Sequence, residues 1–185
     1  MHDKQPKLVI LDRDGVINQD SRAYIKSPDE WIALPGSVEA IAALSRAGFR
    51  VVIATNQSGL GRSLFSAATL DDIHAKLEAA VQACGGQIDG IFVCPHLPDA
   101  GCDCRKPKPG LLEQIAQAFD CTVASVPVIG DSLRDLEAAM AAGGQPVLVR
   151  TGNGRSTEER LDKAWNVRVY DDLASAADAI IFGER

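Results

Sequence analysis

The chain has 185 residues, 46% of them hydrophobic and 24% charged, an ordinary globular composition that predicts a single domain over residues 1–185. Its net charge of −6 disfavours binding to a nucleic-acid backbone, which clustered lysine and arginine side chains normally drive. No run approaches about 18 apolar residues and the first seven residues are polar, so we expect no membrane span and no secretion signal. The expectation is a cytoplasmic monomer that binds neither nucleic acid nor membrane.

Apolar runs alternate with segments of helical periodicity along the chain. This alternation is typical of βαβ units, so we expect an α/β fold with a doubly wound, mostly parallel sheet. The predicted strands are residues 8–11, 49–54, 88–93, 126–129, 146–149 and a short segment near Val167. The predicted helices span about 37–47, 70–84, 112–119, 136–142 and 173–181, and residues 16–31 are expected to form a long loop.

The first predicted strand stops at Asp12 and Asp14, two carboxylates separated by one residue. The carboxyl ends of parallel strands meet at one edge of a sheet, where α/β proteins bind their ligands. Polar turns follow the next strands too, at residues 55–59, at Lys106 and at residues 130–132. A lone Asp-x-Asp-Gly is weak evidence, because acidic turns often only end a strand or cap a helix. Four polar turns at one edge predict a shared site.

These turns resemble the four motifs of the haloacid dehalogenase superfamily, in that family's order: Leu11-Asp12-Arg13-Asp14-Gly15, Thr55-Asn56-Gln57, Lys106-Pro107 and Gly130-Asp131-Ser132. The resemblance implies a phosphatase in which Asp12 is the nucleophile and forms an aspartyl-phosphate, while Asp14 is the general acid and then the general base. It also implies Mg²⁺ held by Asp12, Asp131 and the backbone carbonyl of Asp14. Thr55 and Lys106 would complete the catalytic set by holding the phosphoryl oxygens.

A second constellation lies in the loop over residues 94–104, where proline and turn-forming residues disfavour regular structure. Cys94, His96, Cys102 and Cys104 match the Cys₃His set of structural zinc sites, although their one-residue spacers are tighter than usual. The alternative is an accidental grouping. We expect Zn²⁺ to make this loop rigid and to position the two basic residues that follow it. Of the other cysteines and histidines, we expect Cys84 and Cys121 to be core thiols and His2 and His74 to be solvated.

The zinc loop narrows the resemblance to two small branches without a large cap domain, the D-glycero-D-manno-heptose 1,7-bisphosphate 7-phosphatases and the histidinol-phosphate phosphatases. The chain is more similar to the first through residues 12–20, 26–31, 55–59 and 151–154, although Gly61 departs from the usual alanine. That resemblance implies hydrolysis of the C7 phosphate of a small sugar bisphosphate, in the supply of ADP-heptose for the lipopolysaccharide core. A histidinol-phosphate phosphatase is the alternative. A non-catalytic phosphate- or metal-binding scaffold is less favoured, because both acids of the first motif are present.

Charge distinguishes the two substrates. A second phosphate favours guanidinium or amide donors, whereas the ammonium and imidazole of histidinol phosphate favour carboxylates. Cations outnumber acids near the inferred site, which favours the bisphosphate. The expected substrate-binding residues are Asp20, Ser21, Arg22, Thr55, Asn56, Gln57, Ser58, Arg62, Arg105, Lys106 and Ser132. Arg22 and Arg62 are equally well read as solvated charges, and Asp135 is expected to complement a helix dipole rather than to act as an outer acid of the site.

Overall fold

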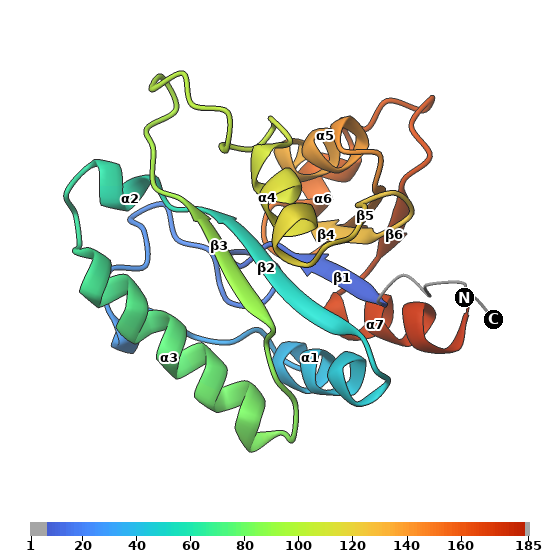
Figure 1. The fold of residues 1–185 in the computed structure, drawn as a ribbon, viewed down its shortest axis with the longest axis horizontal. Helices are drawn as coiled ribbons and strands as arrows, with labels where there is room; N and C mark the ends of the chain where they lie inside the picture. The colour runs from blue at the N-terminus through green and yellow to red at the C-terminus, as the bar shows by residue number, and fades with distance from the viewer. Residues whose placement is uncertain (1–6, 184–185) are drawn as a thin grey trace.

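The computed structural model describes residues 7–183, which form a six-stranded sheet covered by helices (Figure 1). The strand order is β3-β2-β1-β4-β5-β6, and every neighbouring pair is parallel. The strands are β1 Leu8–Leu11, β2 Arg50–Asn56, β3 Gly90–Cys94, β4 Pro127–Gly130, β5 Gln145–Val149 and β6 Arg168–Tyr170. The predicted α/β fold with a parallel sheet is confirmed.

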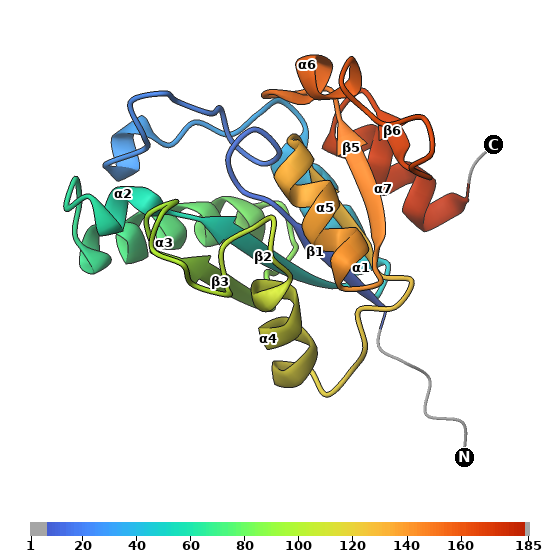
Figure 2. The same cartoon turned by 90° about the horizontal axis from the view of Figure 1, so that it is seen from above.

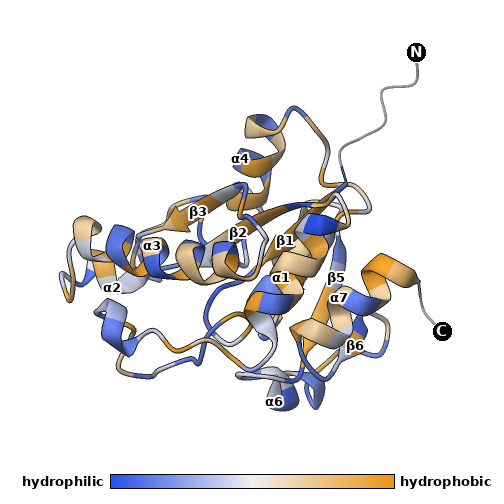
Figure 3. Ribbon diagram, turned by 90° about the horizontal axis from the view of Figure 1, so that it is seen from below, coloured by the Kyte–Doolittle hydropathy of each residue, from blue (hydrophilic) through white to orange (hydrophobic). Residues whose placement is uncertain are grey.

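Helices cover both faces of this sheet (Figure 2). They are α1 Ser37–Arg46, α2 Ser58–Gly61, α3 Ala67–Ala83, α4 Gly110–Ala118, α5 Leu133–Ala141, α6 Gly154–Glu158 and α7 Leu173–Phe182, with a 3-10 helix η1 at Pro28–Glu30. One core packs α1, α3 and α7 against the sheet, and the other packs α4 and α5 against its opposite face. All four residues of β1 are buried because both faces are covered, and Figure 3 shows the hydrophobic colour along β2 and β3 and at the end of α7.

The predicted boundaries differ from the observed ones where a cap or a short helix was not recognised. Helix α3 begins at Ala67 because the side chain of Ser66 accepts a hydrogen bond from the amide of Thr69, so the cap precedes the predicted start. Strand β2 continues to Asn56, two residues past its predicted end. The short helices η1 and α2 lie in segments that the sequence predicted as loop or turn, and α6 lies in a segment for which the sequence predicted no element.

The topology changes direction at β1, which lies between β2 and β4. Strands β2 and β3 extend the sheet on one side of β1, and β4, β5 and β6 extend it on the other. The amide of Asp12 donates to the carbonyl oxygen of Ile129 at 2.8 Å, which keeps the ends of β1 and β4 side by side. Such switch points open a crevice at the carboxyl ends of the strands. Among residues 7–183, no helix has the length and hydropathy that crossing a bilayer requires.

Candidate active site

Three carboxylates gather where β1 and β4 end. Asp12 follows β1, Asp131 follows β4, and Asp135 lies in the first turn of α5. One oxygen of each lies within 4.8 Å of the others. A Cβ atom at Gly15 or at Gly152 would collide with the carboxylate of Asp131, so two glycines with positive φ values make room for it. The sequence predicted the meeting of Asp12 with Asp131 but not the closeness of Asp135.

Lys106 lies between two of these carboxylates. Its Nζ donates to Asp12 Oδ1 at 2.8 Å and to the carbonyl oxygen of Ala54 at 2.8 Å, and it pairs with Asp135 Oδ1 at 2.6 Å. The other oxygen of Asp135 accepts from the amide of Ser132 at 3.1 Å and from its hydroxyl at 2.6 Å, which caps α5. Asp135 therefore orients Lys106 as well as complementing the helix, a role that the sequence reading did not anticipate.

The charges in this cluster perturb one another. Burial raises the pKa of Asp12 to about 8, because Lys106 offsets only part of the effect and the neighbouring carboxylates add to it. Burial also raises the pKa of Asp131 to about 6, and the nearby Asp135 contributes to the rise. For Lys106, burial acts to lower the pKa, but the carboxylates of Asp12 and Asp135 outweigh it and raise the pKa. Burial would raise the pKa of Asp135, but its ion pair with Lys106 holds that pKa below the usual value.

The carboxylate of Asp14 is held apart from this cluster by three side chains. Arg13 donates to both of its oxygens at 3.0 to 3.2 Å, and Asn18 Nδ2 donates to Oδ1 at 2.9 Å. Gln57 Nε2 donates to Asp14 Oδ2 at 2.7 Å and to Thr55 Oγ1 at 2.9 Å. The side chain of Asp14 is 21% exposed and lines the pocket, whereas Thr55 is only 1% exposed. Asp14 therefore faces the pocket with a defined orientation.

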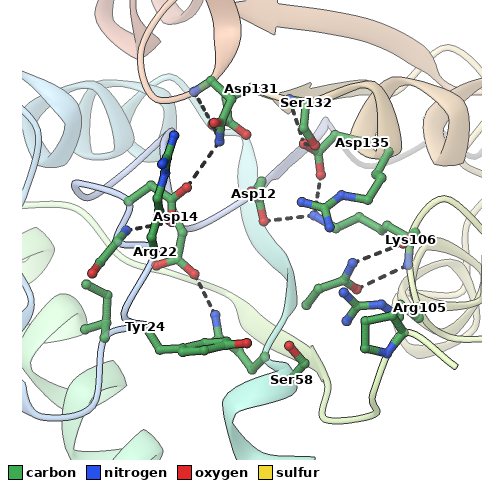
Figure 4. A pocket seen from close by; sticks show the side chains of 18 of the residues that line it. Asp12, Asp14, Arg22, Tyr24, Ser58, Arg105, Lys106, Asp131, Ser132 and Asp135 are labelled. Atoms are coloured by element: carbon green, nitrogen blue, oxygen red, sulfur yellow. Dashed lines mark hydrogen bonds and ion pairs between the residues drawn. The ribbon is translucent and has the colours of Figure 1, made fainter. Parts of the chain in front are cut away.

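A pocket opens over these residues, and Figure 4 shows Arg22 and Tyr24 on one side of it and Arg105 and Lys106 on the other. The predicted substrate-binding residues that line it are Asp20, Ser21, Arg22, Asn56, Gln57, Ser58, Arg62, Arg105, Lys106 and Ser132. Thr55 is not among the lining residues, and its side chain is buried next to Gln57, from which it accepts a hydrogen bond. The structure thus brings the other predicted contacts to one pocket.

Asn153, Tyr24 and Arg134 also line the pocket and were not predicted as site residues. The backbone N–H of Asn153 donates to Asp131 Oδ2 at 2.7 Å. Its side-chain Nδ2 donates to the same oxygen at 3.1 Å and to Asp20 Oδ2 at 3.1 Å. A signal for Asn153 existed, because it belongs to a polar turn that follows a strand at the same edge of the sheet. Tyr24 has a φ of 65°, a conformation that is uncommon for a bulky residue and that its sequence context does not reveal.

The four predicted zinc ligands also come together. Cys94 Sγ lies 3.6 Å from His96 Nδ1 and 3.7 Å from Cys102 Sγ, and Cys104 Sγ lies 3.3 Å from His96 Nδ1 and 3.7 Å from Cys102 Sγ. A tetrahedral Zn²⁺ with ordinary bond lengths requires about 3.8 Å between two sulfur ligands and about 3.6 Å between sulfur and nitrogen. These four separations are within about 0.3 Å of the edges of such a tetrahedron, and all four ligand atoms lie within 4.8 Å of one another.

Two sequence interpretations outside the pocket are wrong. His74 is 8% exposed rather than solvated, and its Nε2 lies 3.2 Å from Arg13 Nη1. It stands four residues after Leu70 and three before Leu77, so helical periodicity places it on the buried face of α3 despite its polar side chain. Cys84 is the C-cap residue of α3 and packs against neither hydrophobic core, so it is not a core thiol, whereas Cys121, which is also partly buried, packs against the core that includes α4 and α5. His2 lies outside the described residues.

Comparisons with known proteins agree with this geometry. Two family models match, one described as HAD-hydrolase-like over residues 103–176 and one as polynucleotide kinase 3 phosphatase over residues 7–132. The D-glycero-beta-D-manno-heptose-1,7-bisphosphate 7-phosphatase of Bordetella bronchiseptica is 57% identical over 95% of this chain and 98% of its own length. The phosphatase of the same name from Escherichia coli is 34% identical over 94% of each chain.

Solved structures agree as well. The crystal structure of D,D-heptose 1,7-bisphosphate phosphatase from B. bronchiseptica, complexed with magnesium and phosphate, superposes with a TM-score of 0.92 at 57% identity. The match covers 95% of this chain and 98% of that one. A D,D-heptose 1,7-bisphosphate phosphatase from Burkholderia thailandensis, 48% identical, superposes with a TM-score of 0.74 over 92% and 96% of the two chains.

Proposed function

Because the chain belongs to the haloacid dehalogenase-like family of D-glycero-beta-D-manno-heptose-1,7-bisphosphate 7-phosphatases, we propose that its pocket releases the C7 phosphate of that sugar bisphosphate. The enzyme is a phosphoric monoester hydrolase. The observation that carries the assignment of residues is the 2.8 Å contact between Lys106 Nζ and Asp12 Oδ1. It joins a carboxylate nucleophile to a cation suited to an incoming phosphate, at the switch point of the sheet.

The reaction proceeds in two displacements. In the first, a carboxylate oxygen of Asp12 bonds to phosphorus, the bond from phosphorus to the C7 oxygen breaks, and the Asp14 carboxyl gives that oxygen its proton. In the second, Asp14 takes a proton from water, the oxygen of that water bonds to phosphorus, and the bond between phosphorus and Asp12 breaks. Phosphate leaves, and both acids return to their starting forms. Lys106 balances charge on the phosphoryl group throughout.

The carboxylates of Asp12 and Asp131, with the backbone carbonyl of Asp14, are the residues that we propose hold Mg²⁺. Support comes from the oxygen cluster itself, because hard oxygen ligands suit this ion and one lysine leaves the cluster with excess negative charge. When bound, Mg²⁺ supplies charge neutralisation that lets an anionic ester approach an anionic nucleophile. Asp135, whose oxygens are engaged by Lys106 and Ser132, acts by positioning the lysine.

We propose that Cys94, His96, Cys102 and Cys104 hold a structural Zn²⁺ that takes no part in the chemical step. The support is the fit of their spacing to a tetrahedron and the position of the loop beside the pocket. Arg105 follows the last ligand directly and donates from Nη1 to the carbonyl oxygen of His96 at 3.2 Å. A rigid loop therefore fixes both Arg105 and the neighbouring Lys106.

The second phosphate of the substrate is proposed to meet the guanidinium groups at the pocket mouth. Arg22, Arg62 and Arg105 line the pocket, and Arg134 joins them from the start of α5. Guanidinium groups bind phosphate by charge-assisted hydrogen bonds. A monophosphate places its single phosphate at the reacting centre and has no second phosphate for these groups to bind. Asp20 is held by Asn153 and is suited to sugar hydroxyls. Thr55 accepts a hydrogen bond from Gln57 Nε2 at 2.9 Å, and with Lys106 it is proposed to hold the phosphoryl oxygens.

The test is phosphate release from D-glycero-beta-D-manno-heptose 1,7-bisphosphate and from histidinol phosphate under identical conditions with Mg²⁺. We expect the higher kcat/KM for the bisphosphate, with heptose 1-phosphate as the product identified by phosphorus NMR. A higher kcat/KM for histidinol phosphate would transfer the assignment to the other branch. Loss of the C1 phosphate first would overturn the proposed orientation of the substrate.

A cytoplasmic, monomeric, single-domain enzyme stays our expectation for this chain. Size-exclusion chromatography with light scattering measures the oligomeric state directly. A mass near 19.7 kDa is expected, and a multiple of that mass would replace the monomer with an oligomer.

A further inference from the structure

Arg13 is a buried charge in the middle of the first motif. Its side chain is 0% exposed, although arginine is rarely buried completely. Nε donates to Asp14 Oδ1 at 3.2 Å, and Nη2 donates to Oδ1 at 3.0 Å and to Oδ2 at 3.1 Å. One edge of the guanidinium group is thereby committed to the proposed proton donor. A guanidinium group is planar, so whatever fixes its other edge fixes the plane in which Asp14 is held.

His74 contacts the other edge of the Arg13 guanidinium group. It comes from α3, 61 positions along the chain, and its Nε2 lies 3.2 Å from Arg13 Nη1. A guanidinium group can only donate, so the imidazole must be the acceptor and carry its proton on Nδ1. Burial, and then the charge of Arg13, lower the pKa of His74 to about 4, against the opposite effect of Asp71 and Asp14. The ring is neutral near pH 7 and able to accept.

We propose that His74 is a positioning residue for the reaction, acting through Arg13 on the carboxyl group of Asp14. This inference rests on the proposed function, because it matters only if Asp14 protonates the leaving oxygen. Without an acceptor at position 74, an N–H of a buried guanidinium group has no partner, and the group is expected to turn toward another one. Asp14 then shifts with it and meets the C7 oxygen less often in a productive geometry.

The test compares His74→Leu, which removes the acceptor, with His74→Gln, which restores one on a side chain of similar reach. Both are assayed with the sugar bisphosphate, whose alkoxide leaving group needs a proton, and with p-nitrophenyl phosphate, whose leaving group does not. We expect His74→Leu to lower kcat/KM for the sugar bisphosphate about 10- to 100-fold and for p-nitrophenyl phosphate much less. His74→Gln should recover most of the loss. Asp72→Ala, at an exposed position of the same helix, is the matched control.

Asp14→Asn in the same assays separates a failure of the role proposed for Asp14 from a failure of the role proposed for His74. If Asp14→Asn does not show the difference between the two substrates, the proposed role of Asp14 fails. If Asp14→Asn shows it and His74→Leu does not, the role of His74 alone is overturned. The double variant should be no slower than Asp14→Asn, because His74 acts only through that side chain. Should His74→Leu not fold, His74→Met carries the same comparison with a flexible apolar side chain.

Discussion

The side-chain amide of Asn56 is paired with the backbone of Lys106. Its Nδ2 donates to the carbonyl oxygen of Lys106 at 3.1 Å, and its Oδ1 accepts from the amide of Lys106 at 3.2 Å. Asn56 is the last residue of β2, and Lys106 follows the cysteine-rich loop, 50 positions later. The pair therefore fastens the proposed phosphate-binding lysine to the sheet at a point independent of any metal.

We predict that Asn56→Ala lowers kcat about 10-fold, because the ammonium group of Lys106 is no longer held in position beside the carboxylate of Asp12. Two lost hydrogen bonds should also lower the free energy of unfolding by about 1 to 3 kcal/mol. Steady-state kinetics and urea unfolding measure the two effects, with Gln117→Ala, an exposed helical change, as the control. Parental kcat in a destabilised Asn56→Ala protein would show that the pair serves stability alone.

Asp12→Asn should abolish turnover while the fold survives, because a neutral amide is neither a nucleophile nor a good metal ligand. Lys106 keeps its partner Asp135 in this variant, so the cluster is not left with an unpaired cation. Circular dichroism should match the parent, and phosphate release should fall to background. Measurable turnover at the parental rate would exclude Asp12 as the nucleophile.

One tightly held Zn²⁺ per chain is expected, bound separately from Mg²⁺. Metal analysis after dialysis against a mild chelator should find it, and Cys102→Ser combined with Cys104→Ser should remove it and lower the Tm. Cys84→Ser changes a thiol outside the Cys₃His group and should leave zinc content unchanged. A zinc-free parent protein with unchanged stability and activity would contradict this prediction.

The effect of Mg²⁺ on stability should depend on pH. In the metal-free site the pKa of Asp12 is raised to about 8 and that of Asp131 to about 6. A carboxyl group whose pKa rises on folding stabilises the fold below its unfolded pKa, and this contribution is lost as the pH rises through the folded value. The metal-free protein should therefore lose stability from about pH 4 to about pH 8 through these groups.

Mg²⁺ binds the deprotonated acids, so it should raise the Tm more at about pH 8 than at about pH 5.5. Differential scanning fluorimetry with Mg²⁺ and with EDTA at both pH values makes the comparison, and Asp131→Asn should remove most of the difference. An equal shift at both pH values would mean that these carboxyl groups do not release protons to solvent when Mg²⁺ binds.

Arg105→Ala should raise KM for the heptose bisphosphate about 10-fold and change KM for a sugar monophosphate less, because we propose that the lost guanidinium group binds the second phosphate. Lys108→Ala is the control, since Lys108 belongs to the same basic segment but pairs with Asp103 at 2.9 Å and does not line the pocket. Equal effects of Arg105→Ala on the two substrates would mean that Arg105 serves only to hold the loop.

The sequence was sufficient to predict which turns meet at the edge of the sheet. Buried strands are read from short apolar runs, and in a parallel sheet their carboxyl ends are brought together by topology alone. That argument places Asp12 beside Asp131 without any knowledge of side-chain contacts. The zinc ligand set was equally readable, because all four residues lie within one short loop.

Contacts between residues far apart in the sequence were not readable in the same way. The pairing of Arg13 with His74 depends on how α3 packs against the loop after β1, and the pairing of Lys106 with Asp135 depends on how the loop after β3 approaches the start of α5. Periodicity reports which face of a helix is buried but not which polar group it meets. Asp135 was therefore read as a local capping residue, which is only one of its two roles.

The glycines behind Asp131 carry a consequence for the choice of ion. Gly15 and Gly152 approach its carboxylate so closely that neither position has room for a Cβ atom, and Asn153 binds the same oxygen from a third direction. Ca²⁺ requires longer bonds to oxygen and more ligands than Mg²⁺ does, and a site must expand to take it. Because Asn153 and two adjacent backbone segments position Asp131, we expect the proposed Mg²⁺ site to bind the larger Ca²⁺ more weakly.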